Sequence, residues 1–274
     1  MAFRRGHRIE LKSPQQFAAM REAGLVVARA LEHIRAVAVP GMTTADIDDL
    51  ARAQLREAGA VSSFLGYHGF PATICVSVNE EVVHGIPGHR PLHDGDVVSV
   101  DFGAIVDGWH ADAAITFGLG HLDETSRRLI DVTERALWAG LARAIAGNRL
   151  SDISHAVETC VRADGAWHVI EDYVGHGIGS AMHMEPPVPN YGPPGRGPEL
   201  RVGMALAIEP MITVGTIDTR VLEDDWTVVT EDDSRAAHWE HTVCITETGP
   251  LVTTALDGGV ARLAALGVQV PRRD

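Results

Sequence analysis

Two aspartates, Asp101 and Asp112, interrupt an otherwise apolar stretch over residues 97–117. The β-branched runs on either side of Asp107-Gly108 predict two antiparallel strands joined by a two-residue turn. This turn sets residue 101 opposite residue 114, so both aspartate side chains project from one face of the hairpin. Two like charges are costly to desolvate, so one acid is protonated, the face is wet, or a cation lies between them. The apolar strands argue against an ordinary solvated face.

The second half of the chain offers similar chemistry in Glu209, Glu240 and His176. Residues 226–246 predict a second hairpin around a turn at 231–234, and this hairpin carries Glu240. His176 lies in a glycine-rich loop, where such a histidine is by itself more often structural than a ligand. Four carboxylates and one imidazole suit a pair of divalent ions such as Mn²⁺, Fe²⁺ or Co²⁺, and paired ions of this kind catalyse hydrolysis.

Apolar periodicity predicts the helices that position these strands. A long helix begins at the Ser13-Pro14 cap and stops at Pro40-Gly41, and a shorter helix covers residues 43–59. Strand-like segments are expected next at residues 67–70 and 73–78. The first half therefore reads as two helices followed by several strands.

The same order returns after Gly118, with a long helix from about Glu124, a break at Gly147 and a short helix that ends at Gly165. Sliding residues 41–69 by 106 positions gives eight identities in 29 positions, where average composition predicts roughly two. The chain therefore contains an internal repeat.

The repeat also relates His84 to His183 and Asp101 to Glu209. A duplicated unit of helices and local hairpins implies an α+β fold, with helices on one side of a curved antiparallel sheet. Asp101 and Glu209 are then expected close together, near the pseudo-two-fold axis.

Length and composition narrow the class of protein. A chain of 274 residues suits one domain over residues 1–274, with repeats over roughly 13–118 and 124–247. No apolar run is long enough to span a membrane, and the first residues lack a signal-peptide pattern. Three widely spaced cysteines fit a reducing cytoplasm and leave any metal to oxygen and nitrogen ligands. A net charge of −14 argues against nucleic-acid binding. The first residues contain a local basic cluster of Arg4, Arg5 and Arg8, which we interpret as a solvated terminus.

Short motifs along nearly the whole chain resemble those of the type I methionine aminopeptidases, which are pita-bread metallopeptidases. They lie at residues 9–14, 20–24, 67–71, 75–80, 83–87, 175–179, 208–210 and 240–242. Each motif is weak alone, but the ordered series is specific. The resemblance implies a single pita-bread domain without an N-terminal extension domain. It also implies co-translational removal of the initiator methionine when the second residue is small, by dinuclear-metal hydrolysis of the first peptide bond.

The resemblance assigns roles to individual residues. The implied ligands of two divalent ions, with the second and the last bridging them, are Asp101, Asp112, His176, Glu209 and Glu240. Mn or Fe is favoured over Co, Zn or Ni. The implied catalytic residues are His84, His183 and Glu209. The two histidines also contact substrate, and the methionine pocket is expected to consist of Tyr67, His68, Phe70, Cys75, Met182 and Trp226. Phe70 and Met182 stand where relatives often carry Tyr and Phe, which is expected to change the shape of the pocket and to preserve methionine recognition.

Two alternatives remain open from the sequence. An aminopeptidase P or prolidase resembles this chain in fold and ligands, but usually carries an additional N-terminal domain. A metal-free pita-bread protein could bind peptides without catalysis, although the presence of all five ligands disfavours it. The expected partner is a peptide or nascent chain, with ribosome docking left open. No membrane or sequence-specific nucleic acid is expected to bind, and the protein is expected to be a monomer.

Overall fold

The first three helices of the described chain begin at residues whose side chains cap the first turn. In this computed structural model, which describes residues 9–270, Ser13 and Gln16 bond to each other's backbone amides. Thr43 caps the second helix in the same way, and Asp123 accepts from the amide of Ser126 at the third. The helices are α1 (Pro14–Val37), α2 (Thr44–Ala58), α3 (Glu124–Leu141), α4 (Leu150–Asp164) and α5 (Val260–Ala265).

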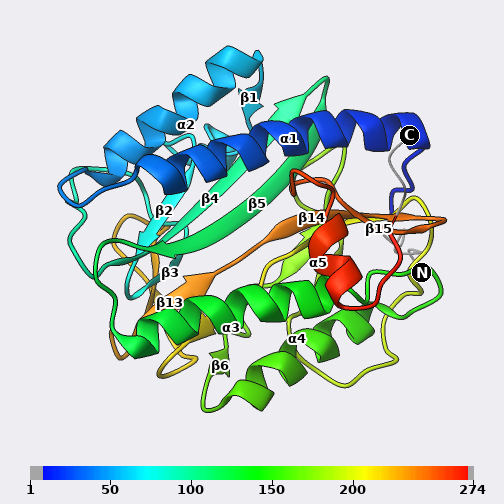
Figure 1. Cartoon of the computed structure of the whole chain (residues 1–274). Coiled ribbons are helices and arrows are strands. Elements are labelled where there is room, and N and C mark those ends of the chain that lie inside the picture. Colours follow the sequence, from blue (N-terminus) through cyan, green and yellow to red (C-terminus); the bar gives the residue numbers. More distant parts are fainter. Residues whose placement is uncertain (1–8, 271–274) are drawn as a thin grey trace, which may run out of the picture.

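The helices repeat as the sequence predicts. Both ends of α4 lie 106 residues after the corresponding ends of α2, which is the offset found in the sequence. Helix α3 ends earlier than its apolar pattern suggests, because the amides of Arg143 and Ala144 bond carbonyls three residues back and tighten the chain into turns. Figure 1 shows α1 running along the long hairpin of the first half and α3 beside α4 in the second half.

All strand pairs within residues 9–270 are antiparallel. The first sheet comprises β1 (Val61–Ser62), β2 (Cys75–Val78), β4 (Val97–Val106) and β5 (Trp109–Gly118). The second follows the order β15 (Gly249–Val252), β14 (His241–Thr246), β9 (Ala205–Ile208), β7 (Gly175–Gly177) and β8 (Met184–Val188). There are also two small sheets in the described chain. One has the order β13 (Ala236–His238), β10 (Met211–Thr213) and β6 (His168–Val169). The other has the order β11 (Thr219–Val221), β12 (Val228–Thr230) and β3 (Glu81–Val83). The fold class is α+β, as predicted.

The β4–β5 hairpin has the predicted register. Asp101 pairs with Ala114, and Gly103 pairs with Asp112. Asp107 and Gly108 both have positive φ, at 50° and 80°, as a type I′ two-residue turn requires. The turn therefore places both aspartates on one face of the hairpin.

Strand β5 also joins the two halves of the molecule. The amide of Glu240 donates to the carbonyl of Ala114 at 2.9 Å, and the Ala114 amide donates back at 3.3 Å. The Thr242 hydroxyl accepts from the Asp112 amide at 3.0 Å and donates to the Asp112 carbonyl at 2.8 Å. These bonds fix the acids of the two halves relative to each other.

Two local predictions are wrong. Residues 67–70 form no strand: Tyr67–Gly69 is a 3₁₀ turn, because the amide of Phe70 bonds back to the Tyr67 carbonyl. The predicted second hairpin over 226–246 also does not form. The turn at 231–234 exists, but β12 pairs with β11 and β3, whereas β13 pairs with β10. Glu240 lies between β13 and β14, and its backbone pairs with β5.

None of the described helices is long and apolar enough to cross a lipid bilayer. The basic cluster Arg4, Arg5 and Arg8 lies outside the described residues.

Candidate metal centre

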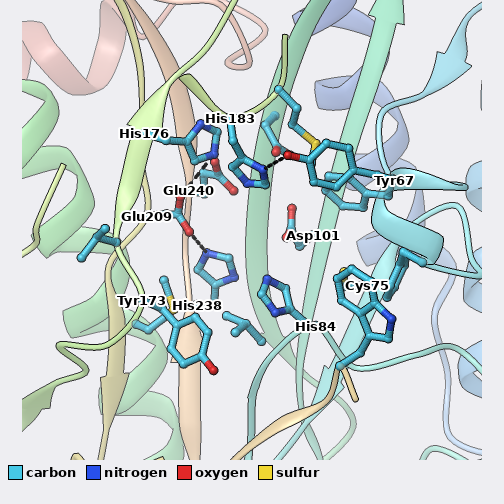
Figure 2. Close-up of a pocket in the computed structure, with 18 of the residues that line it drawn as sticks. Tyr67, Cys75, His84, Asp101, Tyr173, His176, His183, Glu209, His238 and Glu240 are labelled. Carbon is cyan, nitrogen blue, oxygen red and sulfur yellow. Dashed lines mark hydrogen bonds and ion pairs between the residues drawn. The ribbon is translucent and has the colours of Figure 1, made fainter. Parts of the chain in front are cut away.

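A single cavity of about 340 Å³ contains every residue that the sequence analysis selected for a site. Its acidic wall comes from both halves of the chain: Asp101 and Asp112 from the β4–β5 hairpin, Glu209 from the end of β9, and Glu240 from the segment before β14. Figure 2 shows Glu209 and Glu240 beside His176, with Asp101 facing them across the cavity. Asp101 and Glu209 therefore line the same cavity, as predicted.

The carboxylates are buried without enough positive charge to balance them. Asp112 is 3% exposed and Glu240 is 1% exposed. One oxygen each of Asp101, Asp112 and Glu240 is buried and finds no hydrogen-bond partner among residues 9–270. Burial raises the pKa of Asp112 to about 7. Burial and neighbouring carboxylates hold the pKa values of Asp101 and Glu240 well above their usual range.

Orphaned, buried carboxylate oxygens are rare in proteins because each loses its hydration without replacement. Divalent cations supply that replacement and prefer such oxygen donors, with imidazole as a common partner. The donor set therefore fits divalent metal ions on the chemistry of the residues present. Asp112, His176 and Glu240 offer atoms within 4.8 Å of one another, as do Glu209, His238 and Glu240.

His176 is oriented so that one ring nitrogen remains free for a ligand. Its Nδ1 lies 3.0 Å from the Gly177 carbonyl oxygen, which can only accept, so Nδ1 carries the proton. The other nitrogen, Nε2, lies 3.5 Å from Oε1 of Glu209. Burial lowers the pKa of His176 to about 3, which keeps the ring neutral. This is the form that binds metals.

The glycines around His176 let strands pass too closely for a side chain. A Cβ on Gly175 would stand 2.3 Å from the carbonyl oxygen of Ala207, and a Cβ on Gly177 would stand 2.2 Å from that of Glu185. The glycine-rich motif thus positions the imidazole by allowing β7 to pack against its neighbours.

The other two predicted active-site histidines enter from opposite halves. Nδ1 of His183 bonds the Tyr67 hydroxyl at 2.8 Å, and the His183 ring centre lies 4.3 Å from that of His176. His84 has a positive φ of 61°, and its ring meets Tyr173 edge-on at 5.8 Å. Burial lowers the pKa of His84 to about 4 and also lowers the pKa of His183. Both rings are therefore neutral hydrogen-bonding groups.

An apolar pocket adjoins the acids. Phe70 and Trp226 meet edge-on at 5.0 Å, and Phe70, Cys75 and Met182 are all at most 5% exposed. Burial and nearby carboxylates raise the pKa of the Cys75 thiol well above its usual range, so this cysteine is a poor nucleophile. The pocket suits an apolar side chain next to the acidic wall.

Comparison with known proteins identifies the family to which this arrangement belongs. The profile of metallopeptidase family M24 matches residues 18–247. The chain belongs to this family.

Named relatives agree in length as well as in sequence. The chain is 52% identical over 257 residues to methionine aminopeptidase 1 of Mycobacterium tuberculosis, covering 91% of this chain and 97% of the relative. It is 48% identical to methionine aminopeptidase 1 of Bacillus subtilis, covering 87% and 96%. The crystal structure of methionine aminopeptidase from Thermotoga maritima superposes with a TM-score of 0.89 at 44% identity, covering 90% of this chain and all of that one. The M24 fold is the pita-bread fold, as predicted.

Some residues that line the cavity of this M24 peptidase were missed by the sequence analysis. They are Phe64, Val83, Tyr173, Val174, Met211 and His238. Tyr173 could have been found, because the repeat pairs it with Tyr67. His238 also had a signal, since it lies two residues before Glu240 in extended chain and can share its face. Phe64 carried no comparable signal.

His238 is 2% exposed, and its Nε2 has no hydrogen-bond partner among the described residues. That nitrogen lies 3.9 Å from Oε2 of Glu209, too far for a hydrogen bond. Figure 2 shows its ring below Glu209 and beside His84. Burial lowers the pKa of His238 to about 3.

Proposed function

We infer that this M24 peptidase is a type I methionine aminopeptidase, a metal-dependent hydrolase that removes N-terminal methionine. The relatives named methionine aminopeptidase, which match along nearly their whole length, support this activity. The observation that carries the inference is that one cavity combines two features: buried carboxylate oxygens that lack hydrogen-bond partners among the described residues, and an apolar pocket beside them.

Five residues would hold two divalent ions, with Mn or Fe favoured and Co, Zn or Ni also compatible with the donor set. The residues that would hold them are Asp101, Asp112, His176, Glu209 and Glu240, all of which line the cavity. When bound, such ions lower the pKa of water towards neutrality, polarise a carbonyl oxygen and orient a substrate. The buried position of the acids supports this proposal, because removal of bulk water strengthens each charge interaction.

His183 would stabilise the charge that develops on the substrate's carbonyl oxygen. The Tyr67 hydroxyl lies 2.8 Å from Nδ1 of His183, and burial raises the pKa of that hydroxyl, so it keeps the proton that it would donate to Nδ1 in this proposal. A donor at Nδ1 requires the proton of the neutral imidazole to lie on Nε2. His183 would therefore donate from Nε2 to the oxyanion, where preorganised donors are most effective.

His84 and Glu209 would serve the leaving nitrogen. His84 would hydrogen-bond the scissile amide nitrogen, and Glu209 would carry the proton that this nitrogen needs to depart as an amine. The two histidines come from matched places in the repeat and face the acids from opposite halves of the chain. This symmetry supports their use on the two sides of one peptide bond.

The methionine side chain would enter the apolar pocket. Its lining is Tyr67, His68, Phe70, Cys75, Met182 and Trp226. Aromatic edges and a buried thiol suit a flexible, polarisable thioether. Nascent proteins with small second residues are the proposed substrates. The free thiols Cys75, Cys160 and Cys244 support a cytoplasmic location.

Peptide specificity tests this inference against the prolidase alternative. Met-Ala-Ser is expected to be cleaved with a kcat/KM at least about 10-fold above that of Ala-Pro-Ser, because only methionine fills the apolar pocket. The assay follows release of the free first amino acid by the metal-loaded enzyme. A preference for Ala-Pro-Ser would contradict the inference and would show that the protein is an aminopeptidase P.

Replacement of His84 by alanine is expected to lower kcat about 5- to 30-fold, the cost of one hydrogen bond worth about 1 to 2 kcal/mol. The bound metal should remain, because His84 contributes no ligand in this assignment. Metal content by mass spectrometry and steady-state kinetics on Met-Ala-Ser check both parts. Loss of metal from His84→Ala would show that the residue had been assigned the wrong role.

A further inference from the structure

One imidazole in the cavity has no function in the mechanism above. His238 stands on β13, where its backbone is fixed: its amide donates to the Thr116 hydroxyl at 2.9 Å, and its carbonyl accepts from the same hydroxyl at 2.6 Å. Its Nε2 is buried and has no hydrogen-bond partner in the described part of the chain. A rigid, desolvated nitrogen without a partner is costly unless something binds it.

The surroundings of that nitrogen are acidic. Glu209 lies between two imidazoles: its Oε1 is 3.5 Å from Nε2 of His176, and its Oε2 is 3.9 Å from Nε2 of His238. Ligand atoms that each lie about 2.1 Å from one ion are separated by up to roughly 4.2 Å. Both distances fall within this limit, and the second is too long for a hydrogen bond.

The acids also form a second ligand group around this nitrogen. Glu209, His238 and Glu240 offer atoms within 4.8 Å of one another, as do Asp112, His176 and Glu240. The two groups share Glu240 and contain one imidazole each. We propose that His238 is a sixth ligand of the metal centre and that its Nε2 binds a divalent ion together with carboxylate oxygens of Glu209 and Glu240. This proposal rests on the proposed metal centre and adds a residue to it.

A second imidazole would change the metal preference of the site. Carboxylates alone suit Mn²⁺, whereas imidazole ligands favour Fe²⁺, Co²⁺, Ni²⁺ and Zn²⁺. His238→Gln, which keeps a polar side chain but removes the imidazole, is therefore expected to weaken Co²⁺ binding more than Mn²⁺ binding. Mutation of a residue that only hydrogen-bonds a metal ligand typically lowers metal affinity about 10- to 100-fold. Loss of a direct ligand should lower the affinity for Co²⁺ by at least this factor.

The experiment titrates chelator-treated protein with Co²⁺ by calorimetry and records proton NMR spectra of the Co²⁺-loaded protein in H₂O and D₂O. Each histidine that binds Co²⁺ through Nε2 has a strongly shifted, exchangeable Nδ1 proton. Two such signals are expected in the wild-type protein and one in His238→Gln. His238→Ala provides a second variant, and His84→Ala is the matched control, since it removes a neighbouring cavity histidine that is not a ligand.

The outcomes separate this proposal from the metal centre itself. One imidazole signal in the wild type, with unchanged Co²⁺ affinity in both His238 variants, would overturn the role of His238 and leave the five-ligand centre intact. Unchanged Co²⁺ binding in His176→Ala as well would instead contradict the proposed metal centre. Loss of one signal and of affinity in both His238 variants, but not in His84→Ala, is the expected result.

Discussion

Glutamine in place of Glu240 is expected to give a folded protein that no longer retains two divalent ions and has lost at least about 10³-fold in kcat. Glu240 belongs to both candidate ligand groups, so a single substitution weakens both. Removal of one oxyanion-hole donor elsewhere costs about 10² to 10³-fold, and loss of a shared metal ligand should exceed this. Metal content after dialysis and turnover of Met-Ala-Ser are the measurements.

Stability of the metal-free protein provides the control for this variant. Burial and neighbouring acids raise the pKa of Glu240, so in the metal-free fold its stabilising contribution is present at low pH and lost as pH rises through that raised pKa. Above neutral pH the glutamine variant should therefore have a Tm no lower than that of the wild type. Full activity in a well-folded Glu240→Gln protein would contradict the two-metal assignment.

Peptides of the form Met-Xaa-Ser are expected to fall in kcat/KM by about 10²-fold or more when alanine at Xaa is replaced by lysine. His84 and His183 both line the cavity with the acids, and we expect them to crowd the residue that follows the scissile bond. A misplaced carbonyl costs on the order of 10²-fold. Methionine should therefore be removed before Gly, Ala, Ser, Thr, Pro, Val or Cys and retained before Lys, Glu or Phe.

Lysine adds charge as well as size, so Met-Leu-Ser is the matched comparison. If crowding is the cause, leucine should reduce kcat/KM nearly as much as lysine, whereas glycine should not. Equal values for Met-Ala-Ser and Met-Lys-Ser would defeat the steric explanation.

Turn, capping and glycine patterns in the sequence were enough to predict several local features of the structure. Asp107-Gly108 set the register that brings Asp101 and Asp112 to one face of the hairpin, because a two-residue turn permits only one pairing. Ser13 and Thr43 are the N-caps of the first two helices, and each forms a capping box with the residue three positions later in the sequence. The motif around His176 likewise indicated a close approach of backbones, which the packing of β7 against β9 and β8 requires.

Only the tertiary structure decided features that depend on partners distant in sequence. Glu240 pairs with Ala114 rather than within a hairpin of its own, because β12 and β13 find their hydrogen-bond partners in separate sheets. Tyr67 turns in a 3₁₀ segment and reaches His183, 116 residues away. His238 faces Glu209 because Thr116 holds its backbone from the other half of the chain. Periodicity and turn chemistry act over a few residues, so they specify the elements, whereas the sheet pairings between the two halves specify the cavity.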